Sequence, residues 1–168
     1  MKGVIFDLDQ TIVDSSIAES LRNSRNWSRV YELIPSFSIY GGIIELMNEL
    51  RIKQYKIAVV TTSPSVYTER VLNKFNIDCD LRVCYHDVSK RKPYPDQYLK
   101  VIQSLNLEPS KTYTLGDRAI DIQAAHSANI ISCACYWGTK EKALLDESNP
   151  NHKFGTVTQA REFFKITT

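Results

Sequence analysis

Short apolar segments typical of β-strands alternate along the chain with amphipathic segments typical of helices. The expected strands cover residues 2–8, 55–63, 81–85, 111–117, 130–137 and a short stretch from 152, and the expected helices cover 41–54, 64–77, 95–107, 119–129, 140–146 and the end of 152–166. Strands separated by helices favour a parallel sheet that is covered on both faces. The sequence therefore predicts an α/β fold with a Rossmann-like parallel sheet and helices on both of its faces.

Length and composition narrow the class of protein. The 168 residues correspond to about one domain, so we expect a single domain over 1–168. Hydrophobic residues make up 43% and charged residues 24%, as in ordinary globular proteins. A net charge of +2 gives no indication of nucleic-acid or membrane binding. No run of 18 apolar residues occurs, so we expect a cytoplasmic protein.

The four cysteines have the spacings C-x4-C and C-x-C, which do not match a zinc-binding pattern. Cys133 and Cys135 lie in an expected strand, where both would point to the same face. We therefore expect buried free thiols.

Polar side chains stand where the expected strands end. They are Asp7 and Asp9 after the first strand, Thr61 and Thr62 after the second, Asp117 after the strand at 111–117 with Asp121 one helical turn later, and Lys92 in a loop. In open α/β folds, ligands bind just beyond the carboxyl ends of the strands. We therefore expect these groups to converge on one edge of the sheet.

The chemistry of this set suits a metal ion and a phosphate. Carboxylates this close repel one another and raise one another's pKa, unless a hard dication such as Mg²⁺ lies among them. Thr61 offers a hydroxyl donor, the amides that open the following helix offer more, and Lys92 offers a positive charge. For that helix we expect Ser63 as N-cap and Pro64 as the first residue. One acid is then free to attack phosphorus, and another to act as general acid and base.

At this point the chain resembles the phosphatase branch of the haloacid dehalogenase-like hydrolases, from its start to about residue 135. DLDQT resembles the first motif of that family (D-x-D-x-T), Thr61 the second, Lys92 in RKPYPD the third, and GDRAID the fourth (G-D-x-x-x-D). All four motifs in order, each at a strand end or loop, are a specific signal, whereas a lone D-x-D is a weak one.

The resemblance implies roles for the four acids and a Mg²⁺ cofactor. Asp7 would be the nucleophile and a metal ligand. Asp9 would protonate the leaving oxygen and then activate water, while its backbone carbonyl binds the metal. Asp117 would bind the metal directly, and Asp121 would act in its outer shell. The acid at position 9 favours a phosphatase or phosphomutase over a dehalogenase or transport ATPase.

The resemblance also implies a phosphate-binding set. Thr61 would hold the phosphoryl oxygens with help from the Thr62 amide, and Lys92 would neutralise charge on the nucleophile and the phosphate. Taken singly, each residue also has an ordinary structural explanation. Thr61 and Thr62 could be common β-branched strand residues, Lys92 could be a solvated loop residue, and Asp121 could be an acid favoured in the first turn of a helix. For Arg118 we favour solvent over substrate.

Three functions stay open at this stage. The first is a Mg²⁺-dependent phosphatase that acts on phosphomonoesters through an aspartyl-phosphate. The second is a phosphomutase that uses the same residues, which the short insert at about 15–40 argues against, because a mutase needs a cap to exclude water. The third is a non-catalytic interaction module, against which the retention of every motif acid argues.

Two positions depart from the pattern of the family. Position 10 is Gln where many relatives have Gly, so the shape of the turn after the first strand is in question. Position 129 is Asn where relatives often have Gly, which is a mild change because Asn tolerates the left-handed conformation.

The short insert leaves the substrate unidentified. Residues 18–34 read as one amphipathic helix, on which Arg22, Arg25 and Arg29 share a face. The arginines fit either a solvated face or a surface that binds anionic parts of a phosphorylated substrate. With so little cap, we expect a site open enough for a bulky substrate. Oligomeric state is not indicated.

Overall fold

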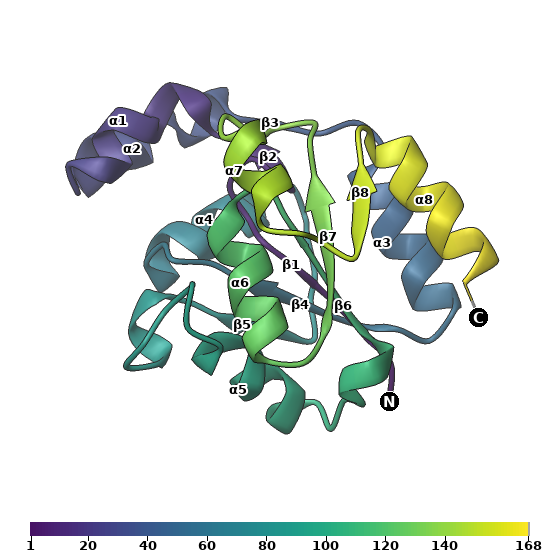
Figure 1. The fold of residues 1–168 in the computed structure, drawn as a ribbon. Helices are drawn as coiled ribbons and strands as arrows, with labels where there is room; N and C mark the ends of the chain where they lie inside the picture. Colours follow the sequence, from purple (N-terminus) through teal and green to yellow (C-terminus); the bar gives the residue numbers. More distant parts are fainter. Residues whose placement is uncertain (168) are drawn as a thin grey trace.

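The computed structural model describes residues 1–167 and contains a six-stranded parallel sheet in the order β5-β4-β1-β6-β7-β8 (Figure 1). The strands are β1 (Gly3–Phe6), β4 (Lys56–Val60), β5 (Leu81–Val83), β6 (Thr112–Gly116), β7 (Ile131–Cys135) and β8 (His152–Phe154). Every neighbouring pair in this sheet is parallel. The predicted α/β class is confirmed.

Helices cover both faces because the central strands are apolar on both sides. On β1, Val4 and Phe6 belong to one core cluster, and Ile5 belongs to the other. The first cluster packs under α3 (Ile43–Ile52), α4 (Ser65–Lys74) and α8 (Val157–Ile166), and the second under α5 (Asp96–Ser104) and α6 (Ala119–Ser127). A shorter helix, α7 (Lys142–Glu147), packs against α6.

The strand order places a crevice at β1 and β6. From β1 the chain moves outward to β4 and β5, then returns to β6 on the other side of β1 and moves outward to β7 and β8. The point at which the connections reverse direction is where open α/β sheets bind ligands, at the carboxyl ends of the strands. Asp7 and Asp117 are the residues that directly follow these two strands.

The predicted single helix over 18–34 is wrong. The structure has two short helices, α1 (Glu19–Asn23) and α2 (Trp27–Leu33), which pack against each other and project from the body of the molecule (Figure 1). Arg25 between them has a φ of 57°, which ends the first helix. Single 3₁₀ turns flank the pair at Ser16–Ala18 and Ile34–Ser36, and a two-stranded antiparallel ladder of β2 (Val13–Asp14) and β3 (Ser38–Ile39) closes the insert. Further 3₁₀ turns lie at Tyr85–Asp87 and Pro109–Lys111.

Several local expectations can be compared with the structure. Helix α4 begins at Ser65 with Pro64 as its N-cap, so the predicted cap at Ser63 is wrong. Gln10 and Asn129 both adopt a left-handed backbone, with φ of 64° and 55°, so each takes the conformation that a glycine would supply. The four cysteines are free, and Cys133 and Cys135 face the same core cluster. Within residues 1–167, no helix has both the length and the apolar character needed to cross a bilayer.

Candidate active site

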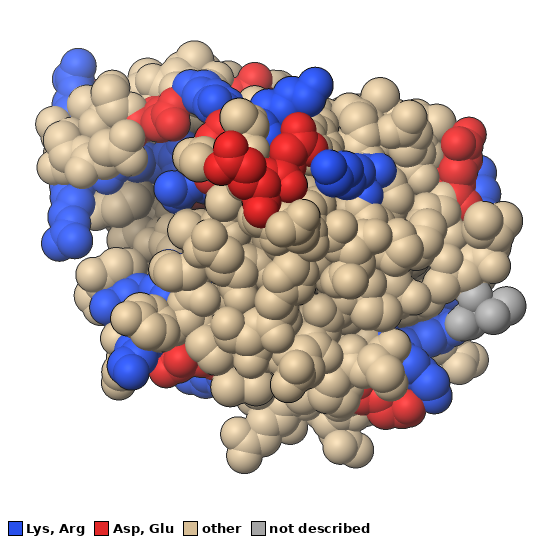
Figure 2. Space-filling model, in the orientation of Figure 1, with Lys and Arg blue, Asp and Glu red and all other residues tan. Residues whose placement is uncertain are grey.

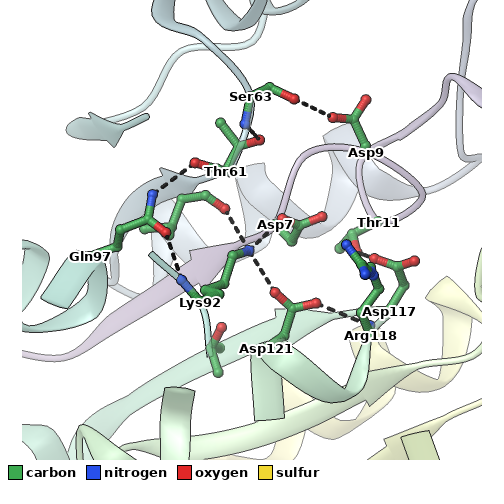
Figure 3. Close-up of polar contacts among 12 residues, drawn as sticks. Asp7, Asp9, Thr11, Thr61, Ser63, Lys92, Gln97, Asp117, Arg118 and Asp121 are labelled. Carbon is green, nitrogen blue, oxygen red and sulfur yellow. Dashed lines mark hydrogen bonds and ion pairs between the residues drawn. The ribbon is translucent and has the colours of Figure 1, made fainter. Parts of the chain in front are cut away.

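Lys92 lies at the centre of the polar groups that the fold brings together (Figure 3). Its Nζ is 2.6 Å from Asp7 Oδ1 and 2.6 Å from Asp121 Oδ1, and it donates a third hydrogen bond to the Val60 carbonyl at 3.2 Å. The Lys92 side chain is only 2% exposed. The ammonium therefore links residues from the ends of β1 and β4 and from the first turn of α6.

Three carboxylates surround this lysine. Oxygens of Asp7, Asp117 and Asp121 lie within 4.8 Å of one another, and all three residues are buried. Gly116 makes this packing possible, because a Cβ atom at that position would be 2.4 Å from the Asp121 Cβ. The Thr11 hydroxyl donates a hydrogen bond to Asp117 at 3.4 Å. Gly116, the first residue of GDRAID, is therefore required because Asp121, the last residue of the motif, packs so closely against it.

Burial and the neighbouring negative charges raise the pKa values of Asp7 and Asp117. Burial raises the pKa of Asp7 to about 7, against the opposing effect of Lys92, and the charges of Asp121 and Asp9 add to the rise. Burial, Asp7 and Asp121 together raise the pKa of Asp117 to about 9. Burial alone would lower the pKa of Lys92, but Asp121 and Asp7 hold it well above its ordinary value.

The cluster fits a hard divalent cation. When all three carboxyls are ionised, they and the single ammonium leave an excess of two negative charges, and all of the anionic donors are oxygens. Oxygen ligands are those that Mg²⁺ prefers, and a dication would offset the repulsion that adds to the effect of burial on the two carboxyl pKa values. The residues are therefore able to hold such an ion.

Asp9 lies apart from this cluster and is held by three hydroxyls and one arginine. Its carboxylate accepts hydrogen bonds from the hydroxyls of Ser15 at 2.6 Å, Ser63 at 3.1 Å and Tyr67 at 2.5 Å. Arg22 forms an ion pair with it, with 2.9 Å between Nη1 and Oδ2. Ser15 and Tyr67 were not singled out from the sequence, because neither lies in a recognisable motif, and Ser63 and Arg22 were noted there for other reasons.

The expected phosphate-binding residues lie on the same edge of the sheet. The Thr61 hydroxyl accepts a hydrogen bond from the Ser63 amide at 3.0 Å, which fixes the loop that leads into α4. Gln97, fully buried and also missed from the sequence, donates a hydrogen bond to the Thr61 carbonyl at 2.8 Å and accepts one from the Lys92 amide at 3.4 Å. Thr62 lines the adjoining cavity.

That cavity has a volume of about 200 Å³ and is lined by every residue predicted for the site. Its lining comprises Asp7, Asp9, Thr61, Thr62, Lys92, Asp117 and Asp121, together with Gln10, Glu19, Arg22, Asn23, Arg118, Ile120, Lys140 and Glu141. An ion pair between Glu19 and Lys140 connects the insert to the segment after β7. Acidic and basic side chains accordingly gather along the upper edge in Figure 2, around α7 and the α1–α2 insert. The insert therefore forms one wall of the cavity. From so short an insert we expected a site open to a bulky substrate, whereas the cavity volume of about 200 Å³ is small.

The three arginines of the insert do not share a face. Arg22 lines the cavity, whereas the Arg25 guanidinium lies 5.9 Å from the centre of the Tyr85 ring, and Arg29 pairs with Glu32 at 3.1 Å on the surface. The break at Arg25 explains this, because it changes the direction of the chain between the first and third arginines. Arg118 lines the cavity with a side chain that is 52% exposed, 3.7 Å from Glu141.

Comparisons with known proteins agree with this geometry. A family model described as haloacid dehalogenase-like hydrolase matches residues 25–135. Pyrophosphatase PpaX of Bacillus mycoides (strain KBAB4) is 30% identical over 115 residues, which are 67% of this chain but 54% of the relative, so the chain spans about half of that protein. Pyrophosphatase PpaX of Bacillus thuringiensis (strain Al Hakam) is 27% identical over 151 residues, 88% of this chain and 68% of the relative.

The fold is also similar to solved structures. A predicted phosphoglycolate phosphatase from Haemophilus somnus 129PT superimposes with a TM-score of 0.86 at 21% identity, covering 100% of this chain and 98% of that chain. At this identity the likeness concerns the fold alone. Because the family model matches about two thirds of the residues, the chain belongs to the haloacid dehalogenase-like hydrolase family.

Proposed function

We propose that this chain is a Mg²⁺-dependent phosphatase that hydrolyses phosphate esters or anhydrides through an aspartyl-phosphate on Asp7. The observation that carries the proposal is the buried cluster in which Lys92 contacts both Asp7 and Asp121 beside Asp117. Its excess negative charge suits a dication, and its lysine suits a phosphate. The names of the two Bacillus relatives support phosphorus–oxygen bond cleavage, including cleavage of a phosphoanhydride.

In the first step a carboxylate oxygen of Asp7 attacks phosphorus, and the bond between phosphorus and the leaving oxygen breaks. Asp9 donates a proton to that oxygen, so the leaving group departs as an alcohol or a protonated phosphate. Lys92, Thr61 and the Thr62 amide bind the phosphoryl oxygens. In the second step Asp9 takes a proton from water, the water oxygen bonds to phosphorus, and Asp7 is regenerated as inorganic phosphate leaves.

Asp7, Asp117 and the Asp9 carbonyl would hold the Mg²⁺, with Asp121 in its outer shell. The ion supplies neutralisation of charge on the phosphoryl group, on which loose phosphoryl transfer largely depends. The cavity of about 200 Å³ favours a small substrate, because pockets for drug-sized ligands are about 300–1,000 Å³. In this proposal the chain, 1–168, is one domain whose insert at about 15–40 takes the place of a full cap.

Replacing the nucleophile tests the function directly. Asp7→Asn should release no phosphate from a panel of small phosphate esters and pyrophosphate, because an amide cannot form the acyl phosphate. Asp78→Asn is a matched control, since Asp78 is 94% exposed and does not line the cavity. Acid-quenched wild-type protein should carry phosphate on the peptide that contains Asp7, as read by mass spectrometry. Undiminished phosphate release by a clean Asp7→Asn preparation would contradict the covalent mechanism.

A further inference from the structure

Arg22 is a cation in the cavity whose hydrogen-bonding capacity is only partly used. Its Nη1 pairs with Asp9, but its buried Nε has no hydrogen-bond partner within the described chain. No other buried side-chain nitrogen or oxygen in residues 1–167 lacks a partner. Guanidinium groups carry five donors in a planar fork, and the edge formed by Nε and Nη2 can bind two oxygens of one anion.

Asp9 does not depend on Arg22 for its own hydrogen bonds. Three hydroxyls, from Ser15, Ser63 and Tyr67, donate to its two oxygens. Tyr67 is fully buried at the start of α4, and its ring packs against Trp27 with 5.5 Å between the centroids. The carboxylate therefore stays anchored when the guanidinium turns toward another anion, and the guanidinium gains a partner for Nε by doing so.

The other cations of the cavity are engaged elsewhere. Lys92 lies between Asp7 and Asp121, Lys140 pairs with Glu19, and Arg118 lies close to Glu141. Arg22 also differs from these in its position, because it comes from the insert and pairs with Asp9, the residue proposed to protonate the leaving oxygen. A group recognised by Arg22 would therefore belong to the leaving part of the substrate rather than to the transferred phosphoryl group.

We propose that Arg22 binds a second anionic group on the leaving part of the substrate. This inference rests on the proposed function and names its substrate class. Preferred substrates are small phosphate esters or anhydrides in which a carboxylate or phosphate lies next to the scissile bond. The cavity of about 200 Å³ sets the short separation, since it must contain both the phosphoryl group at Asp7 and the second anion at Arg22.

Binding of unreactive probes tests this recognition without turnover. Phosphonoacetate carries a phosphonate and a carboxylate, and 2-hydroxyethylphosphonate has similar length without the carboxylate. Calorimetry in the presence of Mg²⁺ should show that wild-type protein binds phosphonoacetate about tenfold or more tightly than the neutral probe, as expected for a bidentate charge-assisted contact. Arg22→Gln should lose most of that margin and bind the neutral probe as the wild type does.

Arg25→Gln is the matched control, because it removes the same charge from the same insert at a residue outside the cavity. It should keep the wild-type margin between the two probes. The same variants should differ in kinetics, with Arg22→Gln raising KM for phosphoglycolate far more than for 2-hydroxyethyl phosphate.

Three results would overturn the inference: equal binding of the two probes by the wild type, a margin that survives Arg22→Gln, or a loss of the margin in Arg25→Gln as well. Equal loss of kcat for both substrates in Arg22→Gln, without a change in their ratio, would show that Arg22 only positions Asp9. The proposed function can fail while this inference holds. In that case wild-type protein would bind phosphonoacetate through Arg22 but would release no phosphate from any substrate.

Discussion

At the scale of single residues, Asp117 is an acid whose burial among other acids lowers stability. Burial at the end of β6, together with the charges of Asp7 and Asp121, raises the pKa of Asp117 to about 9, while Lys92 contacts Asp7 and Asp121 instead. In the unfolded chain the same carboxyl has a pKa of 3.8. The folded state therefore binds more protons than the unfolded state between these two values, and stability falls as pH rises through that window.

Asp117→Asn should raise the stability of the metal-free protein at pH 8, because the amide keeps the shape but, unlike the carboxyl, does not stabilise the unfolded chain by ionising there. We expect a gain on the order of 1–2 kcal/mol, or about 2–8 °C in Tm. Without metal, wild-type Tm should fall between about pH 5 and pH 9, and this fall should be shallower in Asp117→Asn. Thermal melts in EDTA across that range measure both, and a lower Tm for the variant at pH 8 would refute the argument.

Position at a strand end predicted part of the site, and the motif resemblance added Lys92 in a loop and Asp121 in a helix. Asp7, Thr61 and Asp117 follow apolar strands, and parallel topology alone brings such positions to one edge. Tyr67 and Gln97 were missed because both sit inside helices, where a polar side chain reads as an exposed or neutral position. Their roles come from the tertiary packing of α4 and α5 against the strand ends, which no local pattern encodes.

At the scale of elements, the sheet and its main helices followed from hydrophobic periodicity, but the insert did not. Residues 18–34 contain no Gly or Pro to mark the break, so a continuous helix was the natural interpretation. The chain instead turns at Arg25 so that Trp27 on α2 can pack against Tyr67. Packing of this partly buried aromatic residue is expected to offset the cost of a left-handed arginine.

Lys74 on α4 forms hydrogen bonds with the end of this insert. Its Nζ donates hydrogen bonds to the carbonyls of Ile34, Pro35 and Phe37 at 2.9, 2.6 and 2.7 Å. Lys74→Met should lower the free energy of unfolding by about 1–2 kcal/mol, since the carbonyls lose a charged donor. It should also raise KM, because Glu19 and Arg22 on the loosened insert line the cavity. Urea unfolding and steady-state kinetics measure the two effects.

Lys53 offers a matched control for this prediction. Its Nζ binds three carbonyls in the same way, those of Phe164, Lys165 and Thr167 at the end of α8, and Lys53 does not line the cavity. Lys53→Met should lose comparable stability with KM unchanged. If both variants raise KM alike, the effect reflects general destabilisation, and the insert has no separate role in substrate binding.

At the scale of the whole molecule, the two core clusters lie on opposite faces of one sheet, with β1 contributing to both. A domain built in this way is expected to unfold as one cooperative unit. A ligand that binds only the folded state at the β1–β6 edge therefore stabilises the entire domain, and the gain is about 2.7 kcal/mol at a concentration of 100 times Kd.

Mg²⁺ should accordingly raise the Tm of the wild-type protein by about 5–11 °C at such a concentration. Carboxylates must lose their protons to bind the ion, and the pKa values of Asp7 and Asp117 are raised to about 7 and about 9. Metal affinity should therefore increase as pH rises from 6 to 9, and binding should release protons. Calorimetry in buffers of different ionisation enthalpy counts those protons.

Asp117→Asn should show little thermal response to Mg²⁺, whereas Asp78→Asn should respond as the wild type. A wild-type response that is equal at pH 6 and pH 9 would mean that the ion binds away from the buried acids.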